Sequence, residues 1–116
     1  MKVVFDLILS TLKNADIAPV YVQGAHKGII DTPTIIVNPS STRQYMTYTT
    51  TVRYFEIACY GRTVSEAVTL MDEVRETMET LKFTVMPTYI TSIPYFDSTV
   101  KAWQMSGTYR NYAKNK

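Results

Sequence analysis

Residues Thr51 to Leu81, TVRYFEIACYGRTVSEAVTLMDEVRETMETL, predict a strand, a tight turn and a helix in immediate succession. Up to Tyr60, side chains of two kinds alternate, which is the two-residue period of a strand with one buried face. The buried face is expected to carry Phe55, Ile57 and Cys59, and the opposite face Tyr54, Glu56, Ala58 and Tyr60. Gly61 and Arg62 then turn the chain.

The helix is expected to begin at Val64 and to end near Leu81. Thr63 and Glu66 have the T-x-x-E spacing of a capping box, in which the threonine hydroxyl accepts a hydrogen bond from a backbone N–H at the helix start. One apolar stripe follows at helical spacing: Ala67, Leu70, Met71, Val74, Met78 and Leu81. This stripe can lie on the buried face of the preceding strand, so the two elements together form half a core.

The same two periodicities predict the remaining elements. Apolar residues at helical spacing predict a short amphipathic helix over Val3 to Ala15, and Pro19 disfavours its continuation. The expected strands are Val20 to Val22, Thr34 to Val37, a long run from Tyr45 to Tyr60, two runs at Phe83 to Met86 and Tyr89 to Ile93 separated by Pro87, and a closing strand from Thr99 to Tyr109. Together they indicate one α+β domain over residues 1–116, a mainly antiparallel sheet packed against two helices.

Two polar segments stand out from this pattern. Pro39 to Thr50 has no acidic residue and no apolar periodicity, yet it is rich in tyrosine and threonine, which favour extended backbone. A strand from Tyr45 to Tyr60 would exceed the usual length of about 3 to 10 residues, so we expect a protruding β-hairpin arm over residues 39–50. Residues 110–116 are expected to form a polar C-terminal tail.

Composition limits the classes of function. The chain has 116 residues, 12 basic and 10 acidic, so its formal charge of +2 does not indicate a general affinity for DNA. A single cysteine excludes an internal disulfide framework and suits a reducing compartment. The sequence shows no signal-peptide pattern and no apolar run near the roughly 18 residues that span a membrane, so a cytoplasmic protein is expected.

Catalytic and metal-binding patterns are weak. His26 is the only histidine and Cys59 the only cysteine, so a zinc site made of these two residue types is excluded within one chain. His26 lies in a glycine-flanked loop without a nucleophile motif nearby, and no phosphate-binding glycine motif occurs. We therefore expect a protein that is not an enzyme, with no cofactor and no metal.

Two surfaces have open interpretations. Asp72, Glu73 and Glu76 place negative charge on the outer face of the central helix, which is either a solvated face or a docking surface for a basic partner. Tyr54 and Tyr60 share one strand face and could stack with bases, as on an RNA-recognition sheet. Exposed tyrosines on a sheet mark protein interfaces at least as often.

In layout the chain resembles the phage tail terminators, or tail-completion proteins, the small α+β neck family of long-tailed phages. The resemblance covers nearly the whole chain. It rests on the helix Val3 to Ala15, the strand DTPTIIV at 31–37, the arm Pro39 to Thr50, the passage YFEIACYGRTVSEA at 54–67 and the ending WQMSGTYR at 103–110.

The resemblance implies a structural virion protein. Subunits of that family form a ring, typically six-fold, that binds the last ring of the major tail-tube protein, stops tube growth and joins the head connector. DNA would pass through the ring without specific binding, and no membrane would be involved. The residues expected at interfaces are Arg43, Tyr45, Tyr48, Asp72, Glu73 and Glu76. The alternatives are a head-completion or connector protein, and a single-stranded nucleic-acid-binding module that uses the tyrosine face.

Overall fold

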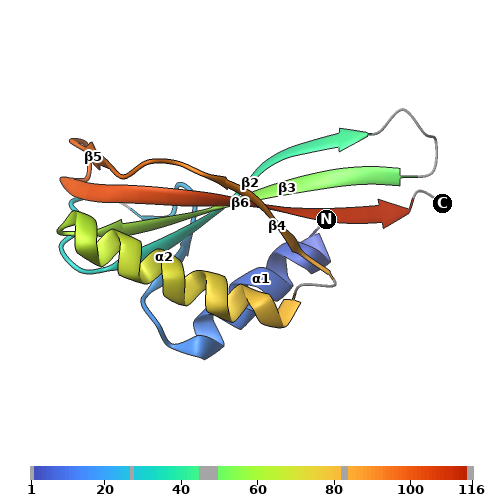
Figure 1. Ribbon diagram of the computed structural model, residues 1–116, viewed down its shortest axis with the longest axis horizontal. Helices are drawn as coiled ribbons and strands as arrows, with labels where there is room; N and C mark the ends of the chain where they lie inside the picture. Colours follow the sequence, from blue (N-terminus) through green and yellow to red (C-terminus); the bar gives the residue numbers. More distant parts are fainter. Residues whose placement is uncertain (1, 27, 45–49, 82–83, 115–116) are drawn as a thin grey trace.

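The computed structural model describes residues 2–26, 28–44, 50–81 and 84–114. Its helices are α1 (Lys2–Ala15) and α2 (Val64–Met78), the latter continued by a short 3-10 turn, η1 (Glu79–Leu81). Its strands are β1 (Val20–Val22), β2 (Thr34–Gln44), β3 (Thr50–Gly61), β4 (Met86–Thr91), β5 (Tyr95–Asp97) and β6 (Ala102–Lys114). Figure 1 shows both helices on one side of the sheet, which confirms the α+β class.

The sheet has the order β1-β2-β3-β6-β4, and β5 pairs with β6 along the same edge as β4. Only β1 and β2 are parallel, and every other neighbouring pair is antiparallel. β3 and β6 pair over their full shared length, from Thr50 opposite Lys114 to Gly61 opposite Trp103. This central pair carries the remaining strands on its two sides.

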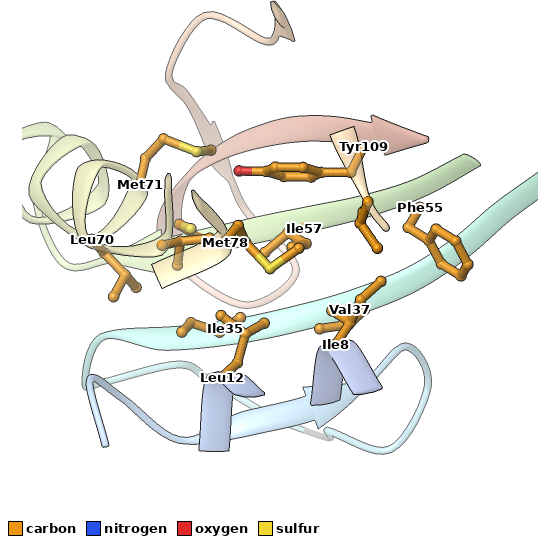
Figure 2. Packing of buried hydrophobic residues seen from close by; sticks show 13 residues of the cluster. Ile8, Leu12, Ile35, Val37, Phe55, Ile57, Leu70, Met71, Met78 and Tyr109 are labelled. Carbon is orange, nitrogen blue, oxygen red and sulfur yellow. The ribbon is translucent and has the colours of Figure 1, made fainter. Parts of the chain in front are cut away.

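The main core lies between the sheet and the helices. Phe55, Ile57 and Cys59 of β3 are fully buried there, as the alternation predicts. The stripe on α2 packs against them, and α1 adds Ile8 and Leu12 (Figure 2). Figure 2 also shows Tyr109 of β6 lying flat over this core, near Met71. Because these side chains come from β3, β6, α1 and α2, the core holds the sheet and both helices together.

The passage from β3 into α2 is tight. The backbone N–H of Glu66 donates to Oγ1 of Thr63 at 3.1 Å, which confirms Thr63 as the N-cap residue. A Cβ atom at Gly61 would lie 2.6 Å from Cβ of Glu66 and 2.7 Å from the backbone nitrogen of Ala67. Glycine is therefore required sterically, because the first turn of α2 folds directly back over the end of β3.

The opposite face of the sheet carries a second, smaller core. Ile30, Ala58, Tyr60 and Ala102 are buried together there, with Ile36 and Val100 packed against them. The backbone N–H of Ile30 donates to the carbonyl of Val100 at 2.9 Å, so the segment before β2 is tied across this face. Tyr60, expected on the outer face, is only 8% exposed for this reason.

The closing strand is longer than predicted. The expected polar tail from residue 110 is wrong as far as Lys114, because β6 continues to that residue. Its partner β3 extends equally far and supplies the backbone hydrogen bonds. Asn111 is buried, and its Nδ2 donates to the carbonyl of Thr84 at 2.8 Å.

The edge beside β6 also differs from the prediction. β4 is one strand that passes through Pro87 instead of two runs separated by it. Pro87 fits because β4 lies at an edge, where a missing N–H costs no ladder bond on the open side. Tyr95 to Asp97 form β5, a strand that lies between the predicted strands Tyr89 to Ile93 and Thr99 to Tyr109.

The expected arm is only partly described. β2 and β3 pair antiparallel out to Gln44 opposite Thr51, with a register shift between Asn38 and Ser41 that inserts one extra residue into β2. Figure 1 shows the far ends of β2, β3 and β6 reaching beyond the helices. Residues 45–49 lie outside the described residues, so the protruding hairpin arm stays a prediction.

Candidate interaction surfaces

The two reactive side chains singled out from the sequence lie apart and differ in environment. Cys59 is fully buried in the main core, and this burial raises the pKa of its thiol to about 12, which leaves it protonated at neutral pH. The ring of His26 meets that of Tyr21 edge-on at 5.0 Å between centroids. No group of three His, Cys, Asp or Glu side chains within the described part of the chain could hold a metal ion.

The structure separates the acidic side chains of α2 into two strips. Asp72, Glu73 and Glu76 are all exposed, as expected. Asp72 and Glu76 are four residues apart and share one strip of the helix. Glu73 lies on the neighbouring strip with Glu66, and both border a depression beside the helix. The expected acidic surface is therefore present, but only part of it adjoins a concave site.

This depression, which we call the α2 groove, has a volume of about 260 Å³. It is lined by Ile17, Pro33, Ser65, Glu66, Thr69, Leu70 and Glu73. Ile17 follows α1 and Pro33 precedes β2, so the groove lies where α2 passes the flank of the sheet that carries β1 and β2. Its apolar lining and acidic rim suit an apolar side chain accompanied by a positive charge.

The other expected interface residues lie in or next to the arm. Arg43 belongs to β2 and stands opposite Val52 of β3. Tyr45 and Tyr48 lie outside the described residues. The structure thus places Arg43 on the extended strand pair, whereas the acidic residues belong to α2, which packs over the middle strands β3 and β6.

The prediction that Tyr54 and Tyr60 are both exposed on the face away from the helices is wrong for Tyr60. Tyr60 is buried, and desolvation together with the neighbouring Asp97 carboxylate raises its pKa to about 12. Tyr54 is half-buried on the same face. A base could not stack on the Tyr60 ring without displacing Ile30 and the chain around it.

A further surface was not found from the sequence. Ile93 is 81% exposed, Phe96 50% and Tyr95 46%, although apolar side chains of this size are usually buried. We call these three residues the β5 patch. The signal in the sequence was the apolar and aromatic content of the IPYF run at 93–96, but Pro94 and the following Asp97-Ser98 are typical of a turn.

No model of a known protein family matches this chain, and no curated protein matches it either. Within the described residues, no helix is long and apolar enough to cross a membrane.

Proposed function

We propose that this chain is a structural protein of a phage tail, which forms a ring on the end of the tail tube, ends its polymerisation and joins the tail to the head connector. The observation that carries the proposal is the long antiparallel β2–β3 pair, which continues past the helices toward the arm on a small two-helix domain. The pair includes parts of three of the segments on which the resemblance to tail terminators rests, namely DTPTIIV at 31–37, the arm Pro39 to Thr50 and the passage at 54–67.

A ring protein needs two complementary surfaces on each subunit and a further one for the tube. This chain offers three separate candidates: the strand ends leading into the arm, the exposed acidic side of α2 and the β5 patch. The partners in this proposal are other copies of the chain in a six-fold ring, the major tail-tube protein and the head-completion or connector protein. The protein would assemble in the host cytoplasm and remain in the neck of the virion.

The two alternatives differ in support. A head-completion or connector protein would use the same ring-forming surfaces, so the alternative within phage assembly stands beside the proposal. A single-stranded nucleic-acid-binding module is less favoured, because such sites stack bases on exposed aromatic rings and Tyr60 is buried.

The experiment concerns the arm. Residues 45–49 are replaced by a Gly-Ser sequence of the same length, which removes Tyr45 and Tyr48 and keeps the pairing of Gln44 with Thr51. We expect thermal unfolding of the free subunit to be unchanged and tail tubes in an assembly reaction to grow beyond their normal length.

The matched control replaces Lys13 and Asn14 on the exposed end of α1 by serine, and it should terminate tubes normally. Normal tube lengths with the arm variant would contradict a role of the arm in termination. If the unmodified chain neither binds tubes nor limits their length, the proposed function is wrong.

A further inference from the structure

The far ends of β2, β3 and β6 carry positive charge without any negative charge. We call residues 39–44, 50–55 and 109–114, which the pairing of these strands brings side by side, the strand end. Figure 1 shows it reaching beyond both helices. All ten acidic residues of the chain lie elsewhere, and the strand end contains the basic residues Arg43, Arg53, Arg110 and Lys114. A charged partner of this region is therefore expected to be negative.

Two side chains of the strand end form a pair on the face away from the helices. Tyr109 is buried in the main core, so the alternation along β6 turns Arg110 and Tyr112 outward. The guanidinium carbon of Arg110 lies 5.3 Å from the centre of the Tyr112 ring, and Tyr112 is 40% exposed. Nε of Arg110 is buried and has no hydrogen-bond partner within the described residues. The pair thus presents an exposed ring beside a cation with an unpaired donor, which suits a carboxylate.

The carboxylates on this outer face lie toward the other end of the sheet. Glu56 stands opposite Thr108 of β6, and it is close enough to act electrostatically on Tyr60 and Tyr95. Asp97 acts on the same two tyrosines. The surroundings of β5 are therefore negative, and they differ in charge from the strand end.

α2 carries the opposite charge to the strand end. Arg75 is the one basic residue between Val64 and Leu81, whereas the acidic residues there are Glu66, Asp72, Glu73, Glu76 and Glu79. Like charges one turn apart, such as Glu73 and Glu76, destabilise a helix, and a positive partner relieves the repulsion. The exposed side of α2 therefore favours a positively charged partner.

The α2 groove is suited to a single ring. Its volume of about 260 Å³ is below the roughly 300 Å³ at which pockets for drug-sized ligands begin. Its lining is apolar, and the carboxylates of Glu66 and Glu73 border it. An aromatic side chain accompanied by a cation matches both the lining and the charge. The chain presents this combination at Arg110 and Tyr112.

The two surfaces face opposite ways on the subunit. α2 covers one side of the sheet, over β3 and β6, whereas Arg110 and Tyr112 point to the other side. The strand end also extends past the helices, so the α2 of a neighbour can approach it (Figure 1). A contact between two different surfaces is head-to-tail, and its repetition gives a ring where the rotation between subunits closes.

We propose that Tyr112 of one subunit enters the α2 groove of a second copy of this chain, and that this head-to-tail contact, repeated, forms the ring. Arg110 then faces the carboxylates of Glu66 and Glu73. The inference rests on the proposed function, since it assigns the contact between subunits of that ring. The occupant of the groove is a second copy because the chain itself supplies the exposed ring and the cation, on a surface without acidic residues. Nucleic acid is the less favoured partner of the strand end, since a net charge of +2 gives little general attraction to a polyanion.

Charge reversal at the two surfaces tests this contact. Arg110→Glu and Glu73→Lys each bring like charges together, so we expect each variant alone to associate at least about tenfold more weakly than the unmodified chain. An equimolar mixture of the two should recover the association. In an alternating ring the reversed strand end meets the reversed groove, and the unmodified strand end meets the unmodified groove, so opposite charges face each other at every contact. A chain with both substitutions should recover it as well. Light scattering measures association, and thermal unfolding shows whether each variant is folded.

Two single variants are the matched controls. Lys101→Glu reverses an exposed charge in the turn at the other end of β6, and it should associate like the unmodified chain. Asp72→Lys reverses an exposed charge on the neighbouring strip of α2, and it should weaken association less than Glu73→Lys does.

The Tyr112 ring is tested with all charges unchanged. Tyr112→Ser removes the ring that enters the groove and should weaken association by about tenfold. Tyr112→Phe keeps the ring and should associate like the unmodified chain. This pair decides the inference if Arg110→Glu does not fold.

The other outcomes overturn the inference in distinguishable ways. Weaker association of Arg110→Glu and Glu73→Lys without recovery in their mixture would mean that the two surfaces do not meet each other. Normal association of every variant would place the contact elsewhere and leave the proposed function standing. A chain that stays monomeric and binds a single-stranded oligothymidylate through Arg110 would show that the strand end binds phosphates instead. No association of the unmodified chain, alone or with tail tubes, would overturn both the inference and the proposed function.

Discussion

Gly61 links the central strand to the central helix through a contact that allows no side chain. A Cβ atom there would lie 2.7 Å from the backbone nitrogen of Ala67, an atom that cannot move without shifting the first turn of α2. We expect Gly61→Ala to lower the free energy of unfolding by about 1 to 3 kcal/mol, the usual cost of an overpacked site. Urea titration measures it.

Gly24→Asn is the matched control for Gly61. Gly24 has positive φ and open space around its Cβ position, and asparagine tolerates that backbone conformation. Gly24→Asn should therefore lower the free energy of unfolding less than Gly61→Ala does. Equal losses at the two positions would mean that strand and helix do not approach as closely as described.

Thr63 and Leu70 stabilise α2 by different means. Thr63→Ala removes the acceptor for the Glu66 N–H and should cost about 1 kcal/mol, with Thr63→Ser as a control that keeps the hydroxyl. Leu70 is 4% exposed, so Leu70→Ala should leave a cavity that costs roughly 2 to 5 kcal/mol. The denaturant midpoint should be highest for Thr63→Ser, lower for Thr63→Ala and lowest for Leu70→Ala. An unchanged midpoint for Leu70→Ala would contradict the packing of Leu70 in the core.

Residues whose role depends on neighbours in the sequence were predictable, and residues covered by distant segments were not. The cap at Thr63 and the buried side of β3 follow from local spacing, and both are confirmed. Tyr60 alternates like an outward residue, yet Ile30 crosses over it from thirty positions earlier in the chain. The periodicity of the sequence could not predict that contact.

At the scale of elements, the second half of β6 is a structural strand and its removal is testable. A chain ending at Tyr109 loses the pairing with β3 from Tyr54 to Thr50 and the two hydrogen bonds of Asn111, one to Thr84 and one from Arg53. We expect it to melt at a clearly lower temperature, since buried backbone groups would lose their partners.

The control for that truncation ends at Lys114 and removes only the two residues beyond β6. It should melt like the full chain. If the chain ending at Tyr109 also melted like the full chain, residues 110–114 would add nothing to stability, as the predicted polar tail over 110–116 implies.

The missed elements share a physical cause. β6 beyond Tyr109 is mostly polar, and β5 is only three residues long between Pro94 and a turn, yet both are strands because a neighbouring strand supplies hydrogen bonds. Pairing of this kind depends on tertiary context more than on intrinsic propensity. The same cause hid the β5 patch, because Ile93, Tyr95 and Phe96 form an exposed surface only once β5 is paired. By contrast, the expected surface charges of α2 follow from helical spacing alone.

At the scale of the whole molecule, the acidic side of α2 distinguishes a docking surface from a solvated one. Glu73 borders the α2 groove, whereas Asp72 and Glu76 lie on the neighbouring strip. If a basic partner docks at the groove, Glu73→Lys should weaken association, with little effect on thermal unfolding because the side chain is exposed. Asp72→Lys, with the same charge change on the same helix, should weaken association less. Light scattering across protein and salt concentration measures both, and the difference between the two variants should shrink as salt screens the charges. Equal, small effects of Glu73→Lys and Asp72→Lys would return the whole acidic face to the solvated interpretation, since only a partner at the groove separates two side chains that are otherwise alike in charge and exposure.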